Sequence, residues 1–206
     1  MRLMRYRSLR LLLLLSGLWF HLAVAAGPDD RLLPSEGLQG SFQQQLVDAD
    51  GVSLGSSEGR FAILTPHFFR WEITAPGSQL IISDGQDLWQ LDRDLETATR
   101  RPLDPEMLSP MQLLTRSRAQ LSEHYVLEAS LDNLVLTPKA DFSAPFRRLR
   151  IHFEGDVPSS IEVLDSLEQT ISVDLTPDVG ELPDATLFVM QLPPHIELVE
   201  QGTGRR

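Results

Sequence analysis

The stretch from Thr65 to Leu91 constrains the fold most, because three short strand signals follow one another there with turn signals between them. Phe68 to Thr74 is aromatic and β-branched, Gln79 to Ser83 is an apolar run, and Leu88 to Leu91 closes the stretch. The turn signals are Ala75-Pro76-Gly77 and Asp84-Gly85. Glycine accepts a positive φ and proline fixes its own φ, so both favour tight turns. The stretch therefore predicts an antiparallel meander of three strands.

The two-residue period of a strand decides which side chains of the meander share a face. In the first strand the charged Arg70 and Glu72 lie on one face and apolar side chains on the other. The apolar sets that share a face are Phe69, Trp71 and Ile73; Leu80 and Ile82; and Trp89 and Leu91. Aromatic side chains on strands most often pack a core, and a ligand cavity is the alternative.

The first 25 residues have the pattern of a secretory signal peptide. A start with four arginines precedes an apolar run from Leu11 to Val24, and Ala23-Val24-Ala25 supplies small residues for cleavage. The run is too short and wrongly flanked for a membrane-spanning helix. We expect export, removal of residues 1–25, and a mature chain that begins near Ala26 or Gly27.

Charge and cysteine content narrow the partners and the compartment. The whole chain has a net charge of −11, and without the four arginines of the signal it has 14 basic and 29 acidic residues, or about −15. Such a surface disfavours nucleic acid and anionic membranes and suits basic protein partners. The absence of cysteine fits an exported bacterial protein, predicts the periplasm, and excludes a lipidated lipoprotein.

The mature length suits one domain, residues 26–200, with a loose tail at 201–206. Before the meander we expect a short or broken helix within Asp29–Leu46 and a hairpin within Val52–Leu64 around Gly55. After it we expect an edge strand and loop within Asp92–Asp104, and then a helix from Pro110 to His124. Ser109 provides the N-cap of that helix and Pro110 its first residue.

Short strand signals continue to the end of the chain. They are Tyr125–Ala129, Leu134–Thr137, Arg147–Phe153, Ser160–Leu164, Gln169–Leu175, Leu187–Leu192 and Ile196–Val199. The pattern predicts a mainly β fold, in which a continuous antiparallel sheet curls into a barrel or half-barrel with helices on one side.

Motifs that would carry catalysis or hold a cofactor are absent from the sequence. It has no nucleophile elbow, zinc-binding His pair, phosphate loop or dinucleotide fingerprint. The four histidines beyond residue 25 are scattered, and Asp48-Ala49-Asp50-Gly51 indicates a turn rather than a calcium loop. We expect no metal, no cofactor and no enzymatic activity, and take a lipid hydrolase as the least supported class.

Several pieces of the mature chain, in order, resemble the outer-membrane lipoprotein carrier family, LolA. The matching pieces are Phe42-Gln43-Gln44, taken as the end of a first helix, Pro66-His67-Phe68-Phe69-Arg70-Trp71, Ser83-Asp84-Gly85 with Leu88-Trp89, Pro110-Met111 with Leu113-Leu114, Leu134 to Lys139, Glu168-Gln169-Thr170 and Phe188 to Pro194. The resemblance implies an incompletely closed, strongly curved antiparallel β half-barrel, with a helical lid over an apolar concave face.

The resemblance also implies a function and its partners. A carrier of this family takes acylated lipoproteins from an inner-membrane ABC-type exporter, shields their acyl chains in the periplasm and delivers them to an outer-membrane receptor lipoprotein. Each exposed CH₂ is unfavourable by about 0.8 kcal/mol, so acyl chains need such a carrier to cross water. We expect a monomer without nucleic-acid partners. The alternative is a periplasmic lipid-binding module of the same fold, which serves a dedicated lipid pathway or senses lipoproteins.

The resemblance assigns residues to these roles. The acyl-chain cavity is expected to comprise Phe69, Trp71, Ile73, Leu80, Ile82, Trp89 and Leu91, and the lid Met107, Met111 and Leu114. Many members hold the lid closed with an Arg that precedes the proline of the aromatic strand, but here that residue is Thr65. In an extended strand Thr65 points to the same side as Phe69 and Trp71, whereas Arg70 points to the opposite side. Arg116 or Arg118 are the candidates to replace the latch.

Overall fold

The computed structural model describes residues 36–104, 108–178 and 180–201. The expected signal peptide, residues 1–25, and the expected lid residue Met107 lie outside these ranges. The expectation of one domain over 26–200 stays a prediction.

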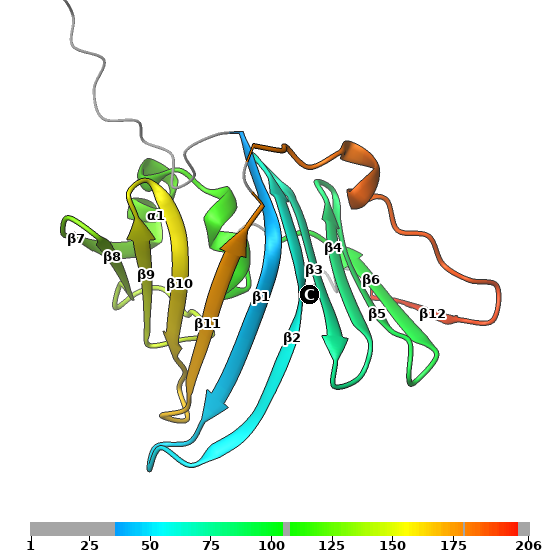
Figure 1. The fold of residues 1–206 in the computed structure, drawn as a ribbon, viewed down its shortest axis with the longest axis horizontal. Coiled ribbons are helices and arrows are strands. Elements are labelled where there is room, and N and C mark those ends of the chain that lie inside the picture. Colours follow the sequence, from blue (N-terminus) through cyan, green and yellow to red (C-terminus); the bar gives the residue numbers. More distant parts are fainter. Residues whose placement is uncertain (1–35, 105–107, 179, 202–206) are drawn as a thin grey trace, which may run out of the picture.

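In the described part of the chain, twelve strands form one open sheet in which every neighbouring pair is antiparallel except β12 and β6. The strands are β1 (Gly37–Val47), β2 (Ser53–Leu64), β3 (Phe68–Ala75), β4 (Gln79–Asp84), β5 (Asp87–Asp92), β6 (Thr97–Pro102), β7 (Tyr125–Ala129), β8 (Asn133–Pro138), β9 (Arg148–Glu154), β10 (Val157–Leu164), β11 (Thr170–Pro177) and β12 (Glu197–Glu200). The order is β12-β6-β5-β4-β3-β2-β1-β11-β10-β9-β8-β7. Figure 1 shows the sheet bent, with β7 and β12 at opposite sides of the molecule. The mainly β, unclosed sheet confirms the predicted fold class.

Within the described ranges, three short helical segments accompany the sheet: η1 (Pro110–Thr115), α1 (Arg118–His124) and η2 (Ala185–Phe188). Segments η1 and η2 both contact β3. Their side chains belong to two separate apolar clusters, so the two segments lie on opposite faces of the sheet. We call the face under η1 and α1 the inner face and the face under η2 the outer face.

The expected helix within Asp29–Leu46 is wrong where the structure describes it, because Gly37–Val47 is strand β1. The expected end of a first helix at Phe42-Gln43-Gln44 lies within this strand and is wrong for the same reason. Leu38 and Phe42, four residues apart, fit a helix face, but they also share a strand face. A Cβ on Gly40 would overlap the Thr176 carbonyl, so glycine there permits the close approach of β11.

The expected helix from Pro110 to His124 is divided into η1 and α1. The start at Ser109-Pro110 is confirmed, but Arg116 and Ser117 have extended backbones that end η1 and cap α1. Ser117 Oγ accepts the backbone N–H of Gln120 at 3.2 Å, and the Gln120 side chain accepts the N–H of Ser117 at 2.9 Å. This capping box begins a new helix in the middle of the expected one.

Three further expectations are corrected by the strand pairing. Val52–Leu64 forms no hairpin, because Ser56 and Ser57 continue β2 and pair with β1. Strand β6 is not an edge, because β12 pairs with it. Leu187–Leu192 is not a strand, because Asp184 caps η2 by accepting the backbone N–H of Thr186 at 2.8 Å.

Candidate functional site

The inner face carries a continuous apolar surface that is rich in aromatic side chains. Phe42 of β1 stacks on Trp71 of β3 with ring centroids 3.7 Å apart, and Phe69 stacks on the same tryptophan at 6.2 Å. Aliphatic side chains of β8 to β11 extend this surface; they are Leu134, Leu136, Leu149, Ile151, Ile161, Val163, Val173 and Leu175. The surface thus reaches from β3 to the far side of the sheet.

Two short helical segments, rather than a second sheet, cover this surface. Leu113 and Leu114 of η1 and Leu121 of α1 are buried in the inner-face cluster, and Met111 packs against it while half-buried. Segment η1 contacts β2 and β3, and α1 contacts β7. Met111 and Leu114 therefore pack on the face that contains Phe69 and Trp71, and their function as a lid stays a prediction.

The seven residues predicted to line one cavity do not share one face. Phe69 and Trp71 belong to the inner-face cluster, and Ile73 packs against it. The other four belong to the outer-face cluster or pack against it; they are Leu80, Ile82, Trp89 and Leu91. The expectation that all seven face a common cavity is therefore wrong, and only the first three adjoin the lid segments.

The register between β3 and β4 explains the division. Arg70 pairs with Ile82 and Glu72 pairs with Leu80, and residues directly opposite in an antiparallel pair point to the same side. The next register places Trp89 opposite Ile82 and Leu91 opposite Leu80. The apolar side chains of β4 and β5 thus lie on the same face of the sheet as Arg70 and Glu72 of β3.

The outer face is closed by the C-terminal part of the chain. Phe188 of η2 is buried there, 5.6 Å from the ring of Phe68. The Arg70 guanidinium donates to the Leu187 carbonyl at 3.0 Å and to the Glu72 carboxylate at 2.7 Å. Burial opposes ionisation of Glu72, but hydrogen bonds and charges from Arg70 and Arg93 outweigh it and lower the pKa of that carboxyl.

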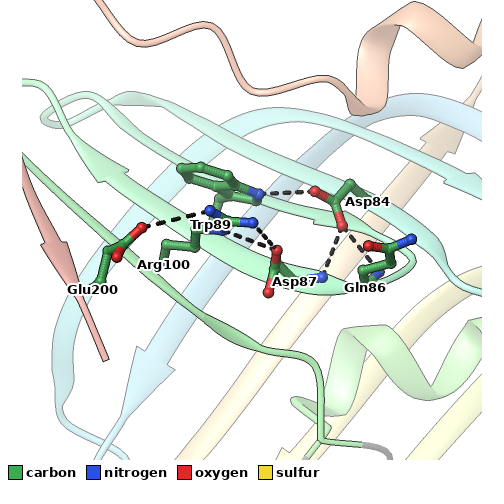
Figure 2. A network of polar contacts seen from close by, with 6 residues as sticks. All are labelled: Asp84, Gln86, Asp87, Trp89, Arg100 and Glu200. Carbon is green, nitrogen blue, oxygen red and sulfur yellow. Dashed lines mark hydrogen bonds and ion pairs between the residues drawn. The ribbon is translucent and has the colours of Figure 1, made fainter. Parts of the chain in front are cut away.

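Trp89 is held on the outer face by a polar network (Figure 2). Its Nε1 donates to Asp84 at 2.9 Å, and the Arg100 guanidinium lies 4.9 Å from the centre of its ring. Arg100 also pairs with Asp87 at 2.6 Å and with Glu200 of β12 at 3.5 Å. The network joins the β4–β5 turn to the C-terminal strand. It gives Asp84 and Trp89 of the sequence Ser83-Asp84-Gly85 with Leu88-Trp89 a structural role.

The three latch candidates lie in different surroundings. Thr65 Oγ1 donates to the Glu36 carbonyl at 2.9 Å, so its bond leads to the start of β1 and not to η1 or α1. Arg116 and Arg118 are both half-buried on the covering segments. Burial lowers the pKa of Arg116. None of these contacts tests the latch role, which stays a prediction.

Two hollows of similar size differ in their chemistry. One, of about 790 Å³, adjoins the inner-face residues Leu38 and Leu175 at one end of β1 and β11, and Leu182 lines it too. The other, of about 710 Å³, is lined by Gln43, Gln44, Gln45, Ser56, Ser57, Glu58, Ala75, Pro76, Ser172 and Asp174. The first suits an apolar ligand and the second does not.

Sequence reasoning missed a group of buried polar side chains under η1. Ser83, Gln112 and Thr115 are 1%, 2% and 6% exposed. They line one closed gap, with no room for a water molecule, together with Phe69 and Arg116. For Gln112 a signal was available, because Ser109-x-x-Gln112 has the spacing of a capping box. Nothing in the sequence marks Ser83 or Thr115 as buried.

Within the described ranges, no helix is long and apolar enough to cross a membrane, and no group of His, Asp and Glu side chains could hold a metal ion. The geometry defines a class of open-sheet proteins with an apolar face under short helical segments. The family model described as outer membrane lipoprotein carrier protein LolA matches residues 34–191.

Individual relatives agree with this match. A protein of Xanthomonas oryzae pv. oryzae (strain MAFF 311018), named outer-membrane lipoprotein carrier protein, is 34% identical over 177 residues, which cover 82% of this chain and 85% of the relative. A protein of the same name from Chromohalobacter salexigens is 32% identical and covers 78% of this chain and 79% of its own. A solved structure, an uncharacterized conserved protein from Thermus thermophilus, is similar in fold, with a TM-score of 0.50 and 14% identity over 82% of this chain and 92% of its own. This chain belongs to the LolA family of outer membrane lipoprotein carrier proteins.

Proposed function

We propose that this protein is a periplasmic carrier that binds the acyl chains of lipoproteins on its inner face. The observation that carries the proposal is the continuous apolar surface around Phe69 and Trp71, which η1, α1 and loop residues such as Phe142 and Phe146 cover. The family membership and the names of the relatives support it.

The division of the cover into two short segments suits reversible binding. Arg116 and Ser117 are extended between η1 and α1, so the cover is not one rigid helix. Acyl chains and the cover compete for the same apolar surface, and cargo binds only as strongly as it outcompetes the cover. A carrier of this kind shields its cargo and can still release it.

The hollow of about 790 Å³ is the natural entrance for acyl chains. Its volume lies within the roughly 300–1,000 Å³ of ligand pockets in proteins. Its apolar lining continues into the inner-face cluster through Leu38 and Leu175, with Val157 packed beside them. Acidic side chains line the hollow too; they are Glu154, Asp174, Asp178 and Glu181.

The carrier would take its cargo from an inner-membrane ABC-type exporter and give it to an outer-membrane receptor. The excess of acidic residues, 29 against 18 basic ones in the whole chain, favours basic surfaces on these partners. The second candidate is a lipid-binding module of the same fold in a dedicated lipid pathway. The same apolar hollow favours it, because the hollow fits any acyl chain.

Native mass spectrometry of the protein purified from its own periplasm separates the two candidates. The carrier predicts a bound fraction whose mass corresponds to one acylated lipoprotein for each protein molecule. A bound fraction that contains only free lipids or fatty acids would contradict the carrier and support the second candidate.

A further inference from the structure

Arg116 lies at the extended junction between η1 and α1, the two segments that cover the inner face. It lines a closed gap, with no room for a water molecule, beside the buried polar side chains Ser83, Gln112 and Thr115. It also lines a cavity of about 270 Å³ beside α1 and Tyr125. Arg116 therefore lies between this gap and the cavity.

The neutral members of this polar cluster already have partners within the protein. Ser83 Oγ donates to the His67 carbonyl at 2.8 Å, and Thr115 Oγ1 donates to the Gln112 carbonyl at 2.8 Å. Gln112 Oε1 accepts the backbone N–H of Ser109 at 3.0 Å. The cluster therefore needs no ligand to satisfy these groups.

The guanidinium of Arg116 is different. Within the described ranges it makes no hydrogen bond or ion pair, although the side chain is half-buried. Burial, with no compensating anion, lowers the pKa of Arg116. Taking a charge out of water is unfavourable unless a partner replaces the lost hydration. Among the described residues nothing uses the hydrogen-bonding capacity of this guanidinium, which leaves it to solvent or to a ligand.

We propose that Arg116 is a polar anchor that binds carbonyl-type oxygen atoms at the carboxyl end of acyl chains held on the inner face. The inference rests on the proposed function and names a specificity-determining residue for it. Phe69 lines the same closed gap as Arg116, so the anchor adjoins the apolar surface that would hold the hydrocarbon.

An acyl chain has a polar carboxyl end and an apolar hydrocarbon, and Arg116 places a polar guanidinium beside the apolar inner face. An acyl chain in a lipoprotein ends in an ester or amide carbonyl, which is an acceptor with no charge. A guanidinium offers five donors in a planar fork, and its hydrogen bonds are stronger than those of neutral donors. A donor at the margin of an apolar surface would bind the polar end and fix how deeply the chain enters. A free fatty acid presents the same oxygen chemistry as a carboxylate.

The test compares Arg116→Met with Arg101→Met, since Arg101 is a half-buried arginine on β6 that lines neither the gap nor the cavity. The probes are a synthetic triacylated lipopeptide, free palmitate, and N-phenyl-1-naphthylamine, an apolar dye without carbonyl oxygen. Affinities come from fluorescence titration of the exported protein, and thermal unfolding of each variant is recorded beside them.

Arg116→Met should weaken lipopeptide binding about tenfold, as the loss of a charged hydrogen bond requires, while Arg101→Met stays within about twofold of wild type. Dye affinity should not change, and the melting temperature should not fall. Unchanged lipopeptide affinity in Arg116→Met overturns the anchor and leaves the carrier intact. An equal loss for dye and lipopeptide, together with a lower melting temperature, overturns it as well, because Arg116 would then be structural.

The remaining outcomes separate the anchor from the proposed function. If the wild type binds palmitate through Arg116 and does not bind the lipopeptide, the anchor is supported and the lipoprotein carrier is contradicted. If the wild type binds neither acyl probe, both are contradicted. Arg116→Lys should restore only part of the affinity, because lysine keeps the charge without the planar fork.

Discussion

Substitution of Leu114 in the cover should strengthen cargo binding, which is the least intuitive consequence of a cover that competes with cargo. Leu114 is 2% exposed and lies in the inner-face cluster, on a segment that contacts β2 and β3. Leu114→Ala removes apolar contacts that exist while η1 lies on the sheet. If cargo displaces η1, the closed state loses these contacts and the loaded state does not.

The size of the effect follows from the atoms removed. Leu→Ala deletes three carbon groups at about 0.8 kcal/mol each, or about 2.4 kcal/mol, which falls within the roughly 2–5 kcal/mol of buried Leu→Ala changes. If the whole of this loss falls on the closed state, cargo affinity rises by about fiftyfold. A smaller rise is expected where Leu114 keeps some contacts after η1 moves, and a larger one where a cavity left by the substitution adds to the loss.

Fluorescence titration with the triacylated lipopeptide measures the affinity, and Leu91→Ala is the matched control. Leu91 is 3% exposed and belongs to the outer-face cluster. Both variants should lose stability in urea, but only Leu114→Ala should bind the lipopeptide more tightly. Weaker binding by Leu114→Ala, or the same change in both variants, would refute the competition between cover and cargo.

Two further predictions concern the sheet itself. The pKa of Glu72 is lowered because Arg70 and Arg93 outweigh its burial, so its contribution to stability is present above about pH 4.3 and is lost as the pH falls through the lowered value. Urea unfolding should therefore show Glu72→Gln less stable than wild type at pH 7, with a smaller difference at pH 3, and a constant difference would contradict this. Gly59→Ala should lower the urea midpoint strongly, because a Cβ there would overlap the Glu72 carbonyl, whereas Gly55→Ala meets no atom within 4 Å and should be tolerated. Equal midpoints for the two glycine variants would count against the close packing of β2 on β3.

Alternation within a strand was predictable from the sequence, but the face of each strand was not. Phe69 and Trp71 were correctly separated from Arg70, because the strand period decides that directly. Whether Leu80 lies with Phe69 or with Arg70 depends on the register across the β3–β4 turn. A shift of one residue in that register moves a whole strand's apolar set to the other face. The apolar side chains of each strand could therefore lie on either face of the sheet. The pairing of the strands decides which face it is.

The covering segments show a second limit. The start at Ser109-Pro110 was visible because capping chemistry is local. The break at Arg116 and Ser117 was visible in principle, since Ser117 and Gln120 have capping-box spacing, but the apolar period across Leu114 and Leu121 suggested one helix. The buried state of Thr115 was beyond prediction, because it depends on packing against β2 and β3.

The outer-face cover was the least predictable element. Leu187–Leu192 is apolar enough for a strand, but Asp184 caps a short helical turn there and Phe188 enters the outer-face cluster. That cluster exists because β4 and β5 turn their apolar side chains away from the inner face. The seven residues of the predicted cavity therefore came from both faces of the sheet.

Residue-level photocrosslinking tests most directly whether the inner face holds acyl chains. A triacylated lipopeptide with a diazirine near the end of one acyl chain is bound, irradiated and mapped by tandem mass spectrometry. Inner-face binding predicts labels on Phe69, Trp71 and Ile73, with none on Leu80, Ile82 or Leu91. Labels confined to the second group would place the cargo beneath η2 on the outer face and would contradict the inner-face site.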